Sequence, residues 1–155
     1  MSFQKTPAGT RGRRSSGKAN AVLKFVQRMM IRQHRRKGDK FQGLDVLYLT
    51  TVGARSGRTV VTPLAYFRDG DDAWLVVASA GGAATHPAWY HNLAAHPDQA
   101  SIEVGGQRVA VTPHQLTGQE RDDAWQRISS TQPRFGKYQS KTDRVLPVLR
   151  LTRAG

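Results

Sequence analysis

The chain has 155 residues, enough for one domain with an ordinary hydrophobic core. It contains no cysteine, which excludes disulfide bonds, thiolate nucleophiles and zinc sites with sulfur ligands, and which fits a reducing cytoplasm. Its net charge of +13 lies almost entirely in residues 1–40, where twelve Lys or Arg accompany one acid, Asp39. Residues 41–155 hold twelve bases and ten acids, so the body of the protein is nearly neutral and does not read as a uniformly basic nucleic-acid-binding domain.

Membrane insertion and export are both disfavoured by the sequence. No stretch approaches the roughly 20 apolar residues of a membrane span, and the longest apolar strand-like run is only 73–78. The segment 19–26, which follows the early arginines, is interrupted by Asn20 and Lys24 and makes no convincing signal peptide. We therefore expect a cytoplasmic protein.

The N-terminal part divides into an arm and a helix. Residues 1–18 combine Gly, Pro, Ser, Thr and Arg without apolar periodicity, which predicts a disordered basic arm. Residues 19–155 form the single domain, and its first stretch, 19–37, predicts an amphipathic helix that ends at Gly38. One helix face carries Val22, Phe25, Val26 and Met29, and the neighbouring face carries Lys24, Arg28, Arg32 and Arg35. Such a helix either packs on the domain or holds it to an anionic membrane surface, peripheral on the inner face of the cell membrane.

Six strand patterns follow, separated by turn residues. They lie at about 46–51, 60–67, 73–79, 100–104, 108–114 and 145–151. Asp69-Gly70 and Gly105-Gly106 are strong hairpin signals, so antiparallel pairing is expected. Pro63 cannot donate a hydrogen bond within a sheet, which places it on an edge strand or at a bulge.

Helical patterns interrupt the strands at about 87–95 and 119–129, the second with Thr117 as its expected N-cap ahead of Glu120. Many short strands with few helices predict a mostly β protein with α (α+β) rather than alternating βαβ units. We expect a small β-barrel of about six antiparallel strands, decorated by the N-terminal helix and two or three short helices.

Two loops are candidates for ligand binding. The loop 53–58, Gly-Ala-Arg-Ser-Gly-Arg, places a hydroxyl and two cations beside backbone amides, which suits a phosphate or a carboxylate. It lacks the spacing of a Walker loop and the helix that follows one. The small residues of the loop 79–82, Ser-Ala-Gly-Gly, would let a flat ligand lie against the main chain. For each loop, an ordinary connection is the alternative interpretation.

Other polar clusters are interpreted structurally. His86, His91 and His96 recur at a spacing of five, which on one helix places them about 140° apart, so no metal site is expected. The acidic run of Asp69, Asp71 and Asp72 reads as a solvated hairpin tip. Neither G-x-S-x-G nor H-E-x-x-H occurs, so no side chain stands out as a nucleophile, and the chemistry is expected to belong to a bound cofactor. Trp89 and Tyr90 are expected to bury at least one ring in the core.

Five motifs occur in the order in which a known family has them. They are 49–57 (LTTVGARSG), 62–64 (TPL), 78–82 (ASAGG), 86–93 (HPAWYHNL) and 138–147 (YQSKTDRVLP). With these motifs, the chain resembles the deazaflavin-dependent nitroreductase family, and the resemblance covers about residues 20–152 in order. Members of that family have a split β-barrel fold and use coenzyme F-420. Any one motif alone is weak, but the combination is specific.

The resemblance implies roles for individual residues. Arg55 and Ser56 would bind the coenzyme's phosphate and acidic tail, residues 60–65 its stem, and residues 77–80 and 88–92 the surroundings of the deazaflavin ring. Ser79 and Tyr138 are the implied catalytic residues, which orient the substrate or relay a proton. The implied coenzyme-binding set is Arg55, Ser56, Arg58, Val60, Val61, Thr62, Pro63, Leu64, Ala65, Val77, Ala78, Ser79, Ala80, Ala88, Trp89, Tyr90, His91, Asn92 and Phe135, the last closing over the ring.

The sequence departs from the family pattern at several positions. Bases that family members often carry are absent at Ala54, Val60 and Ala80, and Arg58 restores one cation at most. Gln132 and Phe135 stand where tyrosines can occur. Weaker coenzyme binding, a different tail length and FMN in place of F-420 are therefore alternatives.

The predicted function is that of an oxidoreductase. It transfers hydride from reduced coenzyme F-420 to an electron-poor acceptor, either a quinone, an activated alkene or a nitroaromatic, with quinones favoured. A flavin- or deazaflavin-binding protein without turnover is the first alternative. The second is a nucleic-acid-binding protein acting through the basic arm, although no specific nucleic acid is expected.

Overall fold

A computed structural model describes residues 5–12, 40–41 and 44–154 of the chain. The predicted helix at 19–37 lies outside these residues, as does the larger part of the predicted arm at 1–18. None of the helices in the described ranges is long and apolar enough to cross a membrane.

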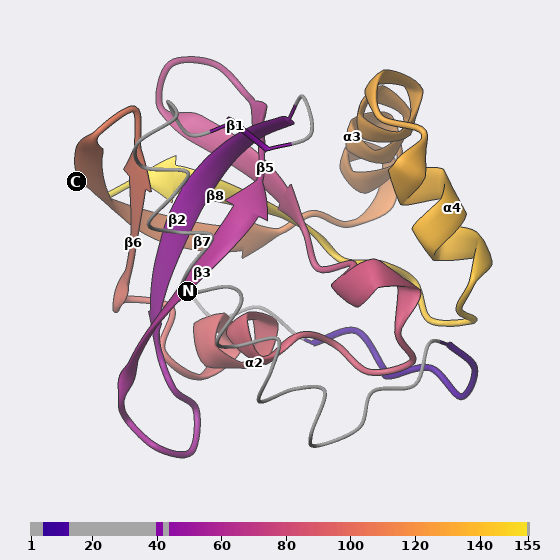
Figure 1. Ribbon diagram of the computed structural model, residues 1–155, viewed down its shortest axis with the longest axis horizontal. Coiled ribbons are helices and arrows are strands. Elements are labelled where there is room, and N and C mark those ends of the chain that lie inside the picture. Colours follow the sequence, from indigo (N-terminus) through magenta and orange to yellow (C-terminus); the bar gives the residue numbers. More distant parts are fainter. Residues whose placement is uncertain (1–4, 13–39, 42–43, 155) are drawn as a thin grey trace.

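A curled, entirely antiparallel sheet forms the body of the protein (Figure 1). Its seven main strands run in the order β3-β2-β6-β7-β8-β5-β4, and a short β1 pairs with the start of β2. The strands are β1 (Lys40–Phe41), β2 (Leu44–Val52), β3 (Thr59–Ala65), β4 (Phe67–Arg68), β5 (Ala73–Val77), β6 (Ala100–Val104), β7 (Gln107–Gln115) and β8 (Val148–Arg153). The α+β class and the antiparallel arrangement predicted from the sequence are confirmed.

The predicted strand at 60–67 is divided in the structure. Tyr66 lies between β3 and β4, and its amide still donates to the carbonyl of Asp45 in β2. From Phe67 on, the chain pairs with β5 instead, as β4. Pro63 lies in β3 opposite Tyr48, and β3 pairs with β2 alone, which confirms its position on an edge strand. The last strand begins later than predicted, because the chain is still an irregular loop at Val145, whose side chain is exposed.

Both hairpin signals are confirmed. Gly105 and Gly106 form a two-residue turn between the paired residues Val104 and Gln107, with φ of 56° and 78°, a left-handed conformation that glycine adopts without strain. Asp69 and Gly70 turn the chain between β4 and β5, where the amide of Asp69 donates to the carbonyl of Ala73.

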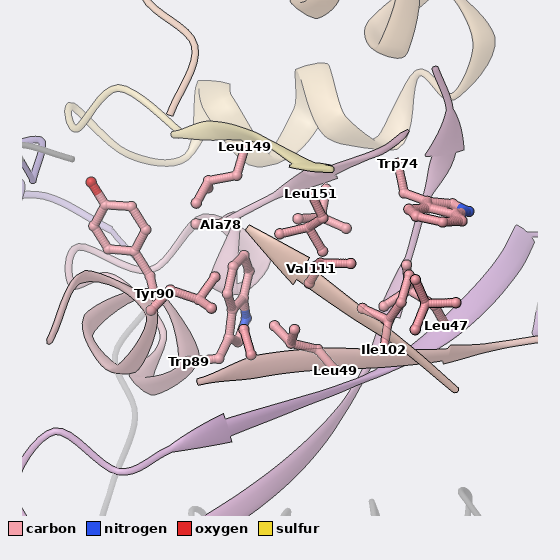
Figure 2. Packing of buried hydrophobic residues seen from close by; sticks show 14 residues of the cluster. Leu47, Leu49, Trp74, Ala78, Trp89, Tyr90, Ile102, Val111, Leu149 and Leu151 are labelled. Atoms are coloured by element: carbon pink, nitrogen blue, oxygen red, sulfur yellow. The ribbon is translucent and has the colours of Figure 1, made fainter. Parts of the chain in front are cut away.

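The core consists of two clusters of apolar side chains on the two faces of the sheet. Figure 2 shows the larger one, in which Trp89 and Tyr90 of α2 (Ala88–Ala95) meet residues of β2, β5, β7 and β8. Both aromatic side chains are buried, which confirms the expectation that at least one ring belongs to the core. The smaller cluster includes Leu75, Ile128, Phe135 and Leu146.

Helices cover this smaller cluster. They are α3 (Gly118–Thr131) and α4 (Arg134–Ser140), and a single 3-10 turn, η1 (Ala80–Gly82), packs against α4. Thr117 is the N-cap residue of α3 as predicted, but its side chain makes no capping hydrogen bond. The carboxylate of Glu120 accepts instead from Arg150 of β8 at 3.1 Å.

The acidic hairpin tip is not simply solvated, as the sequence suggested. Asp69 accepts a hydrogen bond from Arg150 at 2.6 Å and lies 3.6 Å from Arg127, and Asp72 accepts one from Arg153 at 2.9 Å. The reason is tertiary, because β8 runs beside β5 and brings its two arginines alongside the tip.

Residues 5–12 differ from a disordered arm, because they lie against the body of the protein. We call these eight residues the strap. The amide of Gly9 donates to the carbonyl of Ala84 at 2.8 Å, and the amides of Thr10 and Arg11 donate to Asp143, each at 2.8 Å. In Figure 1 the strap is the indigo segment beside the loop that follows η1.

Candidate functional site

A hollow of about 500 Å³ opens between the loop 53–58, the start of β3, one face of α2 and the strap. The residues that line it are Lys5, Gly53, Arg55, Ser56, Val60, Ala88, His91 and Asn92. Six of these eight were assigned to the coenzyme from the sequence; Lys5 and Gly53 were not. The fold therefore gathers residues of two separate motifs, 49–57 and 86–93, together with Val60 and Lys5 around one opening.

The loop 53–58 is held in a compact turn by its own backbone. The amide of Gly53 donates to the carbonyl of Arg58 at 2.8 Å, and the amide of Gly57 donates to the carbonyl of Gly53 at 3.0 Å. The hydroxyl oxygen of Ser56 accepts from the amide of Arg58 at 3.1 Å. A Cβ atom on Gly53 would lie 2.4 Å from this same oxygen, so any larger residue there would displace the Ser56 hydroxyl. The result is a fixed turn that presents the exposed Arg55 at its tip.

Asn92 of α2 anchors this loop from below. Its side-chain oxygen accepts from the amide of Ala54 at 2.9 Å, and its side-chain nitrogen donates to the hydroxyl of Thr51 at 3.2 Å. Asn92 is buried, so these bonds hold in a setting that excludes water. Asn92 therefore positions the loop, and the amide of Ala54 is already used within the protein.

The hollow concentrates positive charge. Lys5 donates a hydrogen bond to Nδ1 of His91 at 3.4 Å. Burial, followed by the charges of Lys5 and then Arg55, lowers the pKa of His91 below its usual 6.5. The imidazole is therefore neutral at pH 7, and the two cations that face it are available to an anion. Together with the hydroxyl of Ser56, they form a donor set suited to phosphate or carboxylate groups.

The histidines do not follow the helical spacing expected for them. His86 precedes α2, and its ring lies 5.9 Å from that of His91, centroid to centroid. The spacing argument fails because only His91 of this pair is on the helix. Within the described ranges, no group of three His, Asp or Glu side chains gathers where it could hold a metal ion.

Behind the hollow, Arg144 fixes the loop that follows β5. Its guanidinium donates to the carbonyls of Ala78 at 2.9 Å, Ser79 at 2.7 Å and Ala83 at 2.8 Å. It also donates to Nδ1 of His86 at 3.0 Å, although only 2% of the residue is exposed. Because arginine carries donors only, this nitrogen of His86 must accept, and the proton sits on Nε2. This role of Arg144 was not predicted from the sequence. The one sequence feature that pointed to Arg144 was its position in the motif 138–147.

The next residues are those implied to surround the deazaflavin ring or to contact the acceptor. Val77 is the last residue of β5 and Ala78 follows it. The side chains of both are buried, so only their backbone could meet a ligand. Ser79 and Ala80 are half-buried, and Ala80 holds a strained φ of 47°. Tyr138 is half-buried on α4, and Phe135 lies in the smaller core cluster with its ring 5.7 Å from that of Tyr138.

The remaining assigned residues lie on other surfaces. Trp89 and Tyr90 point into the core, away from the hollow. Along β3, Val60 and Val61 are exposed at 38% and 40%, and Arg58 is exposed just before them. The four residues that continue the strand are half-buried, namely Thr62, Pro63, Leu64 and Ala65. Of the side chains of the edge strand β3, Val60 lines the hollow, while Leu64 and Ala65 pack against the two core clusters.

Known proteins are similar to this chain in both sequence and fold. A family model described as "F420H(2)-dependent quinone reductase" matches residues 22–153. The F420H(2)-dependent quinone reductase Rv1261c of Mycobacterium tuberculosis is 44% identical over 110 residues, which make up 69% of this chain and 72% of that protein.

Two solved structures resemble the fold closely. One, described as an "F420-H2 Dependent Reductase (FDR-A)", has a TM-score of 0.61 and 34% identity over 68% of this chain and 92% of its own. Another, described as a domain-swapped dimer, has a TM-score of 0.62 and 30% identity over 84% of this chain and 98% of its own. The family match spans every residue around the hollow except Lys5, and the chain therefore belongs to the F420H(2)-dependent quinone reductase family, with its split β-barrel fold and its coenzyme, reduced F-420.

Proposed function

We propose that the protein is an oxidoreductase that uses reduced coenzyme F-420 to reduce a quinone. The hollow beside the loop 53–58 carries this proposal, because it joins two cations and a hydroxyl to the apolar side chains of Val60 and Ala88. A coenzyme with an acidic tail and a flat ring needs both kinds of surface.

The residues present fit such a coenzyme. Arg55 and Ser56, at the tip of the loop, offer a guanidinium and a hydroxyl to the phosphate and the acidic tail. Val60 and Ala88 give the hollow apolar walls where the stem would pass. Asn92 keeps the two sides of the hollow at a fixed separation, so the site does not have to be ordered when the coenzyme binds.

The reaction centre is proposed beside the loop 79–82. When bound, the reduced deazaflavin supplies a hydride to the acceptor. Arg144 holds the main chain of this loop in place, and this main chain carries the Ser79 side chain. Ser79 and Tyr138 come from elements that pack on one another, since the backbone of Tyr138 lies against Gly82. We assign them to orientation of the acceptor and to delivery of the proton that completes its reduction.

The test is a titration followed by turnover. The purified chain is titrated with F-420 and with FMN by fluorescence, and then given reduced F-420 with menadione while the oxidised coenzyme is followed by absorbance. We expect tighter binding of F-420 than of FMN and reoxidation that depends on both protein and menadione. If FMN binds as tightly as F-420 or more tightly, FMN rather than F-420 would be the proposed coenzyme.

The same experiment separates the first alternative from the proposal. Binding of F-420 without reoxidation by menadione, by an activated alkene or by a nitroaromatic would mean a binding protein without turnover. Reoxidation by one of the other two acceptors alone would move the substrate class away from quinones.

A further inference from the structure

Lys5 is the one cation of the hollow that comes from the strap, and it precedes the residues that the family model matches. Its ammonium donates to His91 at 3.4 Å, and both Lys5 and Arg55 act electrostatically on that same imidazole. Two positive side chains from distant parts of the sequence therefore face one small volume. An anion placed between them could contact both cations at once.

The backbone next to Lys5 is fixed by three side chains of the body. The amide of Thr6 donates to the hydroxyl of Tyr90 at 2.9 Å. The side chain of Gln115 donates to the hydroxyl of Thr6 at 3.1 Å, and Nε2 of His86 donates to its carbonyl at 2.7 Å. Every polar group of Thr6 thus has a partner on the body, and the base of the Lys5 side chain is held at the rim of the hollow.

A second anchor holds the other half of the strap. The carboxylate of Asp143 accepts from the hydroxyl and the amide of Thr10 and from the amide of Arg11. These bonds, the hydroxyl of Thr10 first, lower the pKa of Asp143 to about 2. The strap also passes too close to the body for side chains at two points. A Cβ on Gly9 would lie 2.5 Å from Asp143, and a Cβ on Gly12 would lie 2.3 Å from the amide of Ala84.

We propose that the strap is a coenzyme-binding element, in which Lys5 supplies the cation that pairs with Arg55 around the anionic part of the coenzyme. This inference rests on the proposed function and adds Lys5 to the residues that bind the coenzyme. It also explains how the site keeps its charge although Ala54, Val60 and Ala80 carry none. The ligand groups are a phosphate or the carboxylates of the tail, since both match an ammonium and a guanidinium set around a hydroxyl.

The first test compares binding by variants of the full chain, measured by quenching of coenzyme fluorescence. Lys5→Gln should weaken binding of the full coenzyme about 3- to 10-fold, the effect of one partly exposed charge-assisted contact. Lys5→Arg should restore most of the affinity. Arg11→Gln is the matched control, because it removes an equal charge from the same strap outside the hollow, and it should change affinity less than twofold. Unchanged affinity in Lys5→Gln, or an equal loss in Arg11→Gln, would overturn the inference.

Ligand fragments then identify the anion. If Lys5 contacts the tail carboxylates, Lys5→Gln should not affect a fragment that ends at the phosphate; if it contacts the phosphate, that fragment should lose affinity too. A deazaflavin lacking both groups should bind wild type and Lys5→Gln equally, and an unequal effect on it would contradict an electrostatic role. Failure of wild type to bind any of the three ligands would instead overturn the proposed function.

Protease protection gives a readout that does not depend on turnover. Trypsin cleaves after Arg11 only when the strap leaves the body, so the coenzyme should slow this cleavage several-fold in wild type. Asp143→Ala should cleave faster without coenzyme and should bind the coenzyme more weakly. If the coenzyme leaves cleavage of wild type unchanged, or if Asp143→Ala cleaves faster but binds normally, the strap is not part of the site.

Discussion

At the scale of single residues, Arg144 fixes the backbone of the loop beside the proposed reaction centre, although it was not singled out from the sequence. It is a buried cation whose partners are backbone carbonyls and a neutral imidazole. Its position explains why the loop 78–83 can hold a strained residue such as Ala80 near the proposed reaction centre.

Replacing Arg144 should cost both stability and coenzyme affinity. Arg144→Met removes the guanidinium donor from the carbonyls of Ala78, Ser79 and Ala83, although the Ser79 carbonyl keeps the amide of Gly82. We expect the free energy of unfolding to fall by about 3–5 kcal/mol. Arg144→Lys should recover only part of this loss, because an ammonium cannot match the geometry of a planar guanidinium. Urea denaturation measures both variants, and a loss below about 1 kcal/mol for Arg144→Met would contradict the role.

His86 gives the strap a dependence on pH. Burial, opposed by its bond to Thr6 and aided by the charge of Arg144, lowers the pKa of His86 below 6.5. The unfolded chain therefore binds the proton first, so stability is full above about pH 6.5 and is lost as the pH falls towards the lowered pKa. His91 acts in the same direction, since its pKa is also lowered.

Denaturation between about pH 8 and pH 5 tests this effect. Wild type should lose stability as the pH falls through this range, and a double variant, His86→Gln with His91→Gln, should show a smaller loss. Equal slopes in wild type and the double variant would contradict the assignment to these two histidines.

At the scale of elements, the turn 53–58 and the helix α2 form one unit through Asn92. Gly53→Ala should push the Ser56 hydroxyl out of its bond with the amide of Arg58, because the added Cβ would lie 2.4 Å from that oxygen. We expect binding of the full coenzyme to weaken several-fold while the fold is retained, since the change is confined to one exposed turn.

The matched control for this substitution is Gly136→Ala. Gly136 lies within α4, and a Cβ there would meet nothing within 4 Å. Coenzyme affinity should stay unchanged, and stability should rise slightly because alanine favours helix. Fluorescence titration and thermal unfolding compare the two variants, and normal coenzyme affinity in Gly53→Ala would show that the turn need not be rigid.

At the scale of the whole molecule, the attachment of residues 19–37 to an anionic membrane is still a prediction from the sequence. The strap changes how it should be tested, because deletion of the whole N-terminal part would also remove Lys5. We expect that a chain with glutamine at Lys24, Arg28, Arg32 and Arg35 cosediments less with anionic vesicles than wild type does. Each base contributes about 1 kcal/mol at an anionic surface, so the combined effect is large.

Turnover with a water-soluble quinone is the control for the membrane test. It should be the same in wild type and in the four-glutamine variant, because the strap and the hollow are intact in both. If wild type does not bind anionic vesicles at low salt, the helix has another role, and packing on the domain is the remaining interpretation.

The sequence by itself determined the antiparallel β architecture and both glycine hairpins, because these depend on local patterns of two to ten residues. The resemblance to a known family added Arg55, Ser56 and Asn92 as predicted site residues. Tertiary structure decided the roles of Arg144, His86 and Lys5. Their functions come from neighbours far along the chain, such as the carbonyl of Ala83 for Arg144 and the imidazole of His91 for Lys5. Composition alone made the strap read as disordered, because its stability comes from hydrogen bonds to Asp143, Tyr90 and Gln115 that exist only after the barrel has formed.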